Sequence, residues 1–349
     1  MKINFKVFFF SVFFVTIISC IIFLHRAKAE NNKPEVTLLA AGDILFDSEI
    51  EDIIKSKGGR NIFEKVAPIL KQGDIVFGNL ESMMGTKKGV PIYKDLKPYN
   101  FLASLDRHKI LKENGFNVLN LANNHTMDYG PGPIRETRQL LLKEGMHFFG
   151  AGQNLNEARG PAIIIIKGIK FAFLGYSKTY PQDGYASENK AGIAPINLDY
   201  IREDIKNIRG KSDFVIVSIH WGTEYKFMPD ERQKEIAHKT IDSGADMILG
   251  HHPHVLQGIE IYKNKFIIYS LGNFLFDQEN YWKDKSIILS CNFSKDRLKS
   301  IKIIPIDRYE KYLPKPAEGN EKNIILNKIK QISLPLNSGT DIFKNSGLF

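Results

Sequence analysis

The stretch that decides the fold is MILGHHPH, residues 247–254, in which a short apolar run leads directly into a cluster of histidines. The run 247–250 has the length and apolar character of a strand buried on both faces, and such strands are typical of parallel sheets. His252 and His254 alternate along the chain, and alternate side chains of extended backbone point the same way. The two imidazoles can therefore reach neighbouring metal ions, so the stretch predicts a parallel strand that ends at a metal site.

Four other predicted strands end in polar residues of the same kind. Because the carboxyl ends of parallel strands converge on one crevice, all five groups should face a single cavity. A lone histidine or a Gly-Asp pair is commonly a core residue or a turn, but five groups at successive strand ends favour a site. Ser270-Leu271-Gly272-Asn273-Phe274 is expected to shape its floor. The four further groups are Gly42-Asp43, Asn79-Leu80-Glu81, Asn123-Asn124-His125 and His220-Trp221-Gly222.

This collection of side chains has a definite metal preference. Carboxylate and amide oxygens mixed with imidazole nitrogens suit zinc, manganese or iron, and the set is too rich in nitrogen for calcium or magnesium alone. Two such ions, about 3.5–4 Å apart and bridged by a carboxylate, activate water and neutralise charge in a transition state. The sequence therefore predicts two divalent ions in a hydrolytic arrangement.

Short apolar runs alternate with helical patterns along residues 36–307, which predicts an α/β fold. Ten strands suggest two stacked sheets. The predicted strands are 36–40, 75–79, 118–122, 163–166, 171–176, 214–219, 247–250, 266–271, 287–293 and 301–306. The predicted helices are 62–70, 105–114, 134–144, 201–208 and 232–243, with a weak one at 324–332. Residues 308–349, rich in Lys, Asn, Pro and Ser, are predicted to form a C-terminal appendage.

The N-terminus predicts export. Residues 7–24 carry no charge and follow Lys2 and Lys6, so segment 1–29 is expected to be a signal peptide or a membrane anchor, with 30–35 as a linker. Ala27-Lys28-Ala29 resembles a cleavage site, whereas Cys20 offers a lipoprotein reading. All three readings place the catalytic body on the outer face of the cytoplasmic membrane or in the cell envelope.

Composition narrows the class of partner. The chain has 349 residues, 43% hydrophobic and 25% charged, and a formal net charge of +9. Four of its cations lie in segment 1–29, so the remainder carries only +5. That diffuse excess suits a polyanion or an anionic membrane surface and does not predict nucleic-acid binding. With two cysteines, Cys20 and Cys291, a disulfide framework is excluded.

Nine motifs in chain order resemble the CapA family of poly-γ-glutamate capsule synthesis proteins, over residues 36–307. That family is similar to the calcineurin-like metallophosphoesterases, so the resemblance implies a four-layer sandwich with two mixed sheets inside and helices outside. The motifs are Gly42-Asp43, Gly78-Asn79-Leu80-Glu81, Ala122-Asn123-Asn124-His125, Asp128-Tyr129-Gly130, Phe149-Gly150-Ala151-Gly152, Phe173-Leu174-Gly175-Tyr176, His220-Trp221-Gly222, Gly250-His251-His252-Pro253-His254-Val255 and Ser270-Leu271-Gly272-Asn273-Phe274.

The resemblance also implies roles for individual residues. Metal one would be held by Asp43, Glu81 and His254, and metal two by Glu81, Asn124, His220 and His252. His125 would protonate the leaving group, with Asp128 orienting it and keeping it cationic. Asn79, Asn123, Asn273 and Lys94 are the predicted substrate-binding residues. His251 matches no role.

Three departures from the family pattern affect these expectations. Leu45 stands where the superfamily has a histidine ligand, so metal one is expected to bind more weakly. Glu81 has a longer arm than the usual bridging aspartate. Leu102 lies where relatives often have a basic residue, although Lys87, Lys88, Lys94 and Lys97 form a basic patch near the predicted site.

The predicted function is synthesis, transfer or export of a poly-γ-glutamate-type capsule polymer, through hydrolase-like chemistry on an anionic polymer. The resemblance implies membrane-bound capsule ligase components as partners. Two alternatives remain open at this point: a conventional metallophosphoesterase acting on envelope phosphoesters, and a non-catalytic assembly factor.

Overall fold

The computed structural model describes residues 34–59, 62–86, 90–178, 182–309 and 312–345. The chain divides into two compact units, Met1–Glu35 and Val36–Phe349. Only Pro34 and Glu35 of the first unit are described, so the predicted signal peptide or anchor lies outside the described residues. Among the helices that the structure does describe, none has both the length and the apolar character needed to span a bilayer.

The first sheet of the second unit is mixed. Its order is β18-β17-β16-β1-β2-β5-β6, with β15 beside β1, and β1, β2, β5 and β6 run parallel to their neighbours within this group. The antiparallel strands β16, β17 and β18 extend it on the other side of β1. The strands are β1 (Val36–Ile44), β2 (Ile75–Leu80), β5 (Val118–Asn120), β6 (His147–Phe149), β15 (Asn273–Leu275), β16 (Ser286–Ser294), β17 (Arg297–Tyr309) and β18 (Leu313–Pro316).

The second sheet has the order β13-β14-β12-β11-β9-β8, with parallel pairing from β9 through β14. Its strands are β8 (Ala162–Ile166), β9 (Ile169–Ser177), β11 (Phe214–His220), β12 (Met247–His251), β13 (Ile259–Tyr262) and β14 (Lys265–Ile268). Two short ladders pair β3 (Met83–Met84) with β4 (Leu102–Ala103) and β7 (Ala151–Gly152) with β10 (Gly192–Ile193).

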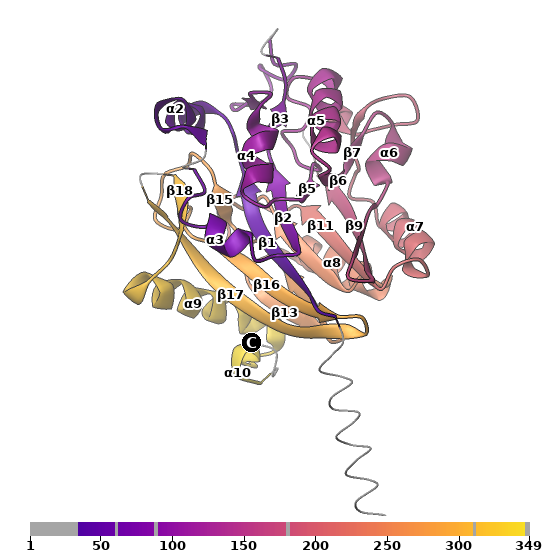
Figure 1. Cartoon of the computed structure of the whole chain (residues 1–349). Helices are drawn as coiled ribbons and strands as arrows, with labels where there is room; N and C mark the ends of the chain where they lie inside the picture. Colours follow the sequence, from indigo (N-terminus) through magenta and orange to yellow (C-terminus); the bar gives the residue numbers. More distant parts are fainter. Residues whose placement is uncertain (1–33, 60–61, 87–89, 179–181, 310–311, 346–349) are drawn as a thin grey trace, which may run out of the picture. The chain divides into compact units, whose positions relative to one another are not determined.

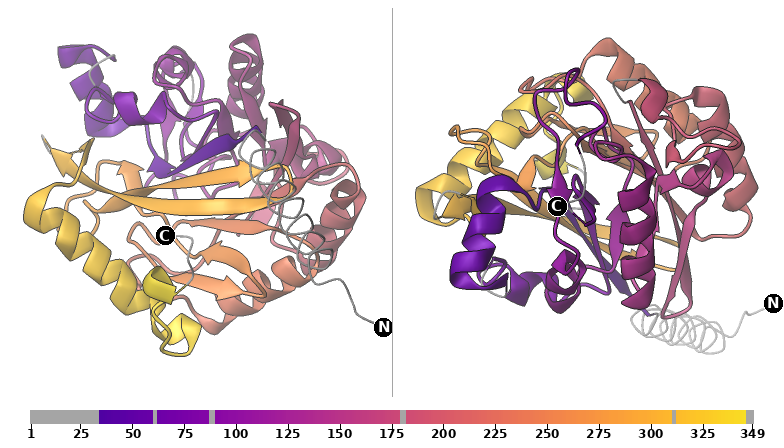
Figure 2. Two further views of the ribbon diagram at one scale, coloured as in Figure 1. Left: turned by 60° about the horizontal axis from the view of Figure 1, so that its bottom comes forward. Right: turned by 90° about the horizontal axis from the view of Figure 1, so that it is seen from above.

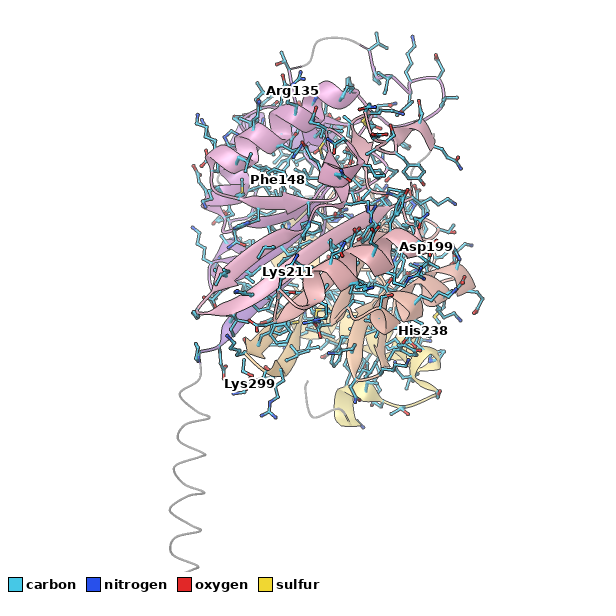
Figure 3. The ribbon with its side chains drawn as sticks, turned by 90° about the vertical axis from the view of Figure 1, so that its right-hand side faces the viewer. Arg135, Phe148, Asp199, Lys211, His238 and Lys299 are labelled. Atoms are coloured by element: carbon cyan, nitrogen blue, oxygen red, sulfur yellow. The ribbon has the colours of Figure 1, made fainter. Side chains whose placement is uncertain are left out.

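Helices cover the outer faces of both sheets (Figure 1). Figure 3 views the molecule from the side of α7 and α8, with Asp199 and His238 labelled on them. The α-helices are α2 (Ser48–Lys57), α3 (Ala67–Leu70), α4 (Arg107–Glu113), α5 (Pro131–Lys143), α6 (Leu155–Arg159), α7 (Leu198–Arg209), α8 (Glu231–Asp242), α9 (Gly319–Ser333) and α10 (Ile342–Asn345). The short 3-10 helices are η2 (Gln182–Gly184) and η3 (Pro335–Asn337).

The alternation of side chains along the strands produces the layers. In β1, Leu38 and Ala40 pack into the apolar cluster between the two sheets, whereas Leu39 and Ala41 pack beneath the helices α2 to α5. Residues of the second sheet contribute to the same central cluster on one face and to the cluster beneath α7 and α8 on the other. The four-layer sandwich expected from the sequence is therefore observed.

The C-terminal segment is part of this sandwich, so the prediction of an appendage at 308–349 is wrong. Ile325, Ile329 and Ile332 form one apolar stripe of α9, and they belong to the cluster between the sheets. Figure 2 shows α9, in yellow, along the side of the molecule where β17 and β13 lie. Asn337 in η3 accepts from the Ile261 N–H at 2.9 Å and donates to the Ile259 carbonyl at 2.8 Å.

The predicted helix 62–70 is also shorter than expected, since only Ala67–Leu70 is α-helical.

Candidate metal centre

Strand register brings the predicted ligands together. Asp43 pairs with Asn79 on one side of β1 and with Asn273 on the other, while His220 pairs with His251 in the second sheet. Asp43, Asn79, His220 and His251 lie at the carboxyl ends of their strands, whereas Asn273 is the first residue of β15. The two sheets meet here, since His251 Nδ1 is 2.9 Å from Asp43 Oδ1. The prediction that distant parts of the chain meet in one place is therefore confirmed.

Two glycines allow the backbones to approach closely at this point. A Cβ atom on Gly42 would lie 1.9 Å from the carbonyl oxygen of Gly272, and one on Gly250 would lie 2.0 Å from that of Tyr269. Neither contact is possible for a residue with a side chain. The glycines directly before Asp43 and His251 are thus required for the packing that places these two side chains.

The first group of candidate ligands, here called the inner cluster, consists of Asp43, Glu81 and His220. Each offers a ligand atom, and these atoms all lie within 4.8 Å of one another. All three residues are buried. His251, which matched no role in the sequence, donates from Nδ1 to Asp43 Oδ1 at 2.9 Å and so holds this carboxylate.

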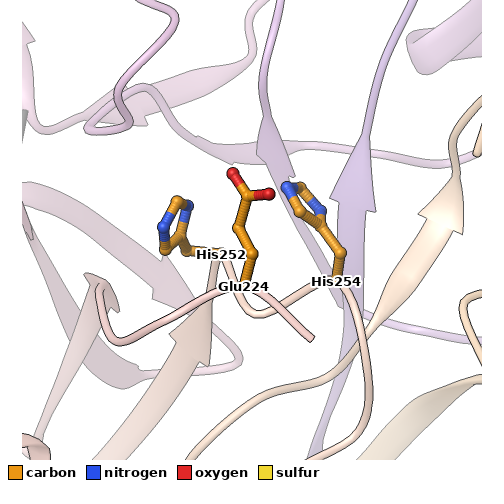
Figure 4. Close-up of side chains that lie close together, drawn as sticks. All are labelled: Glu224, His252 and His254. Atoms are coloured by element: carbon orange, nitrogen blue, oxygen red, sulfur yellow. The ribbon is translucent and has the colours of Figure 1, made fainter. Parts of the chain in front are cut away.

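The second group, here called the outer cluster, consists of Glu224, His252 and His254 (Figure 4). Its ligand atoms also lie within 4.8 Å of one another. The two clusters adjoin, since His254 Nδ1 is 3.6 Å from Asp43 Oδ2 and the rings of His220 and His252 are 4.7 Å apart. Asn124 lies beside the inner cluster, since its Oδ1 is 2.7 Å from His220 Nε2.

The donor atoms fit divalent metal ions. Glu81 Oε2 and His252 Nδ1 are buried and have no hydrogen-bond partner among the described residues. Burial, and then the charge of His254, lowers the pKa of His252 to about 4, and burial beside other imidazoles lowers the pKa of His220 well below 6.5. Both histidines are therefore neutral near pH 7, which is the form that binds a metal.

The two buried carboxyl groups differ. Burial raises the pKa of Glu81 well above its ordinary value, and the nearby charge of Asp43 raises it further. Burial acts on Asp43 in the same direction, but hydrogen bonding and positive charge from His251 outweigh it and lower the pKa of Asp43. The carboxyl groups face only histidines as basic ion-pair partners among the described residues. A cation between them would supply the missing positive charge.

Asn79 lies between these carboxyl groups. Its Nδ2 donates to Asp43 Oδ1 at 2.9 Å and to Glu81 Oε1 at 3.0 Å. Asn120 fixes this orientation, because its Nδ2 donates to Asn79 Oδ1 at 2.9 Å. The Ala122 N–H in turn donates to Asn120 Oδ1. Asn79 therefore joins the two carboxyl groups instead of facing a substrate, contrary to its predicted role.

Two other predicted substrate-binding residues, Asn123 and Asn273, also form hydrogen bonds with protein groups of the site. Asn123 donates to the Leu80 carbonyl at 2.7 Å and accepts from the His125 N–H at 3.0 Å. Asn273 accepts from His254 Nδ1 at 2.8 Å, which leaves Nε2 of that histidine able to bind an ion. The side-chain amides are thus occupied by the protein itself.

Lys97, not Lys94, is the basic residue that reaches the site. Its side chain is buried, and Nζ donates to the Asn124 carbonyl at 2.7 Å and pairs with Asp128. Lys94 is exposed and lines neither of the two cavities described below. Lys87 and Lys88 lie outside the described residues.

His125 and Asp128 form the expected pair, with 2.7 Å between His125 Nδ1 and Asp128 Oδ2. The expected charge state is different. Burial lowers the pKa of His125 and outweighs the opposing effect of Asp128, and the charge of Lys97 lowers it further. Asp128 also accepts from Lys97 and from the Phe101 N–H, so its charge is shared. The prediction that Asp128 keeps His125 cationic is not supported.

Two cavities open beside the centre. One, of about 270 Å³, is lined by residues that include Lys97, Lys178 and Trp221 together with His220 and His252. The other, of about 330 Å³, is lined by His125, His254 and Glu224 with several further acidic and aromatic side chains. The sequence pattern predicted neither Glu224 nor Asn120 as a site residue. Glu224 follows a strand-end histidine by four residues on an irregular loop, and Asn120 lies inside an apolar run, so neither position carries a periodic signal.

Comparison with known proteins gives consistent results. The model of the family described as "Bacterial capsule synthesis protein PGA_cap" matches residues 37–278. The capsule biosynthesis protein CapA of Bacillus anthracis is 33% identical over 292 residues, which cover 82% of this chain and 70% of that protein. The PGA biosynthesis protein CapA of Bacillus subtilis (strain 168) is 34% identical over 296 residues, with coverages of 82% and 77%. Among solved structures, the NAD nucleotidase NadN of Haemophilus influenzae aligns with a TM-score of 0.46 and 14% identity, covering 86% of this chain and 63% of that chain.

Proposed function

The chain belongs to the bacterial capsule synthesis protein PGA_cap family, and from that premise we propose that it acts in the synthesis, transfer or export of a poly-γ-glutamate-type capsule polymer. Two relatives named for capsule or PGA biosynthesis, each about one-third identical over most of the chain, support this proposal. The polymer would be an anionic chain of repeated carboxylates.

The centre would hold two divalent ions, with manganese, zinc or iron as the candidates. The observation that carries this proposal is the pair of adjoining clusters, in which the buried carboxyl groups of Asp43 and Glu81 lie near the neutral imidazoles of His220 and His252. Neither of these carboxyl groups has a lysine or arginine ion-pair partner among the described residues. Bound ions would act as Lewis acids on the reacting ester, amide or phosphoester group.

The protein's own residues have separable roles around that group. Nδ1 of His125 bonds Asp128, so Nε2 is the nitrogen that can take or give a proton in the cavity it lines. The cavity of about 270 Å³ offers the exposed Lys178 to substrate carboxylates, and Leu96, Pro98 and Trp221 to the apolar stem of the polymer. Lys97 in the wall of this cavity is paired with Asp128. An anionic polymer fits this chemistry better than a neutral one.

The N-terminal sequence and the family support a proposal for location and partners. We propose that residues 1–29 export the protein, so that it works at the outer face of the cytoplasmic membrane or in the cell envelope beside membrane-bound ligase components. Protease accessibility of an epitope-tagged chain in intact cells tests this location. Complete protection would contradict it.

Incubation of metal-loaded protein with poly-γ-glutamate and, separately, with phosphoesters tests the function. Change of the polymer that is lost in the double variant Asp43→Ala, His252→Ala supports the proposal. Hydrolysis of an aryl phosphate with manganese, lost in His125→Ala, supports the metallophosphoesterase alternative instead. Protein that contains no metal and stays folded after chelation would point to a non-catalytic assembly factor.

A further inference from the structure

We propose that Glu224 is a metal ligand and that, with His252 and His254, it forms an ion site of its own at the mouth of the centre. This inference rests on the proposed metal-dependent function and deepens it. The ion would be a divalent one of the zinc, manganese or iron class, since its ligands are one carboxylate and two imidazoles.

The geometry of the outer cluster is the first support. Glu224 is exposed on the loop between β11 and α8, yet its carboxylate points into the space between the two imidazole rings (Figure 4). One ligand atom from each residue lies within 4.8 Å of the others. His252 Nδ1 is buried and has no hydrogen-bond partner among the described residues. Nothing else described satisfies this nitrogen.

Backbone strain is the second and independent support. Tyr225, His252 and His254 all have positive φ values, of 65°, 95° and 56°, although none is glycine. Such conformations cost free energy and persist where the surrounding structure enforces them, most often at functional sites. His252 and His254 belong to the outer cluster, and Tyr225 directly follows its third member, Glu224. The backbone strain is therefore concentrated at the outer cluster.

Hydrogen bonds hold the two loops together. The Tyr225 N–H donates to the Pro253 carbonyl at 2.7 Å, which ties the residue after Glu224 to the residue between the two histidines. Gln257 Nε2 donates to the Lys226 carbonyl at 2.8 Å, and Gln257 Oε1 accepts from Gln233 in α8 at 3.0 Å. The position of the Glu224 backbone is therefore fixed relative to both imidazoles before any ion binds.

Glu224 would also compensate for the ligand that the first strand lacks. Leu45 is fully buried and packs with Phe101 and Phe276 in a small apolar cluster, so it offers no donor atom. A carboxylate from the exposed loop instead approaches His254 from the solvent side. The outer ion would be more accessible to the substrate than an ion in the inner cluster.

The test is metal binding by Glu224→Gln, with Glu279→Gln as the matched control. Glu279 is an exposed glutamate that lines the same cavity but belongs to neither cluster. Both substitutions keep the size of the side chain and remove its charge. Chelated protein is titrated with Mn²⁺ by calorimetry, and Co²⁺-loaded protein is compared by visible absorption, which reports the coordination of the ion without any substrate.

We expect Glu224→Gln to lose one ion from the stoichiometry, or to weaken one class of sites by about tenfold or more, because loss of even an indirect partner has such effects. Its Co²⁺ spectrum should change, and Glu279→Gln should match the wild type in both measurements. Equal stoichiometry, affinity and spectrum for all three proteins would overturn the role of Glu224 alone. Absence of ion binding by the wild type would overturn the proposed function and this site with it.

Discussion

Replacing Asn79 with leucine should destabilise the metal-free protein by about 4 kcal/mol. Asn79 is buried between Asp43 and Glu81 and donates one N–H to each carboxyl group. Leucine has a similar shape but no donor, so both carboxyl groups would stay buried with one hydrogen bond fewer. The change in the free energy of unfolding therefore reports how much the Asn79 amide stabilises the two buried carboxyl groups.

The magnitude follows from the charge states of the two acids. The lowered pKa of Asp43 means that one hydrogen bond joins a charged group, which contributes about 2 kcal/mol. Since burial raises the pKa of Glu81 well above its usual range and favours the neutral form, the bond to Glu81 contributes about 1 kcal/mol. The bond that Asn79 Oδ1 accepts from Asn120 contributes about 1 kcal/mol more. Asn120→Leu breaks the same chain of hydrogen bonds, so the double variant should cost less than the two single costs added together.

Urea unfolding in the presence of a chelator measures these free energies. Asn117→Leu is the control, because this asparagine also bridges neighbouring strands, with bonds to the Val76 N–H and the Asp74 carbonyl, but at the opposite end of the sheet. It should cost about 2 kcal/mol for two neutral bonds and add independently to Asn79→Leu. An unfolding free energy for Asn79→Leu within 1 kcal/mol of wild type, or additivity with Asn120→Leu, would refute the reasoning.

Three further predictions concern other parts of the molecule. The pKa of His252 falls from 6.5 to about 4 on folding. The contribution of His252 to the free energy of unfolding is therefore fully present above pH 6.5 and should decrease by roughly 3 kcal/mol as the pH falls to 4. In urea unfolding of the chelated protein, His252→Ala should show a flatter dependence of this free energy on pH. Lys97→Met removes a charge that lowers the pKa of His125, so that pKa should rise in an NMR titration, and an unchanged value would contradict the proximity seen here. Asn337→Ala should cost about 2 kcal/mol in thermal or urea unfolding, because two hydrogen bonds to β13 are lost; wild-type stability would show that η3 does not hold this strand.

Much of the centre could be predicted because strand ends have a recognisable pattern. Asp43, Glu81 and His220 each follow a continuous apolar run, and parallel pairing then determines that they converge. His252 and His254 were identified for the same reason. Their detailed grouping was not predictable, since the turn at Pro253 places both histidines at positive φ instead of in extended backbone.

The remaining features depend on contacts that no local pattern encodes. The side chain of Asn120 lies against Gly150 and Gly175. A Cβ atom on Gly175 would be only 2.4 Å from Asn120 Oδ1, so the absence of a side chain at residue 175 makes room for the amide. That relation follows from the packing of β5 against β9. The packing of α9 against the sheets was also not predicted. Most residues of this helix are polar, and its three buried isoleucines form an apolar stripe whose partner surface is known only from the fold.

The docking of η3 on β13 matters for how copies of this protein behave toward one another. β13 is the last strand of its sheet, and Asn337 occupies backbone groups on its free side in the way that a neighbouring strand would. A fragment ending at residue 307 would uncover this border together with the apolar surface beneath α9. Such a fragment would be expected to self-associate through edge-to-edge strand pairing, so the terminal residues keep the folded chains apart.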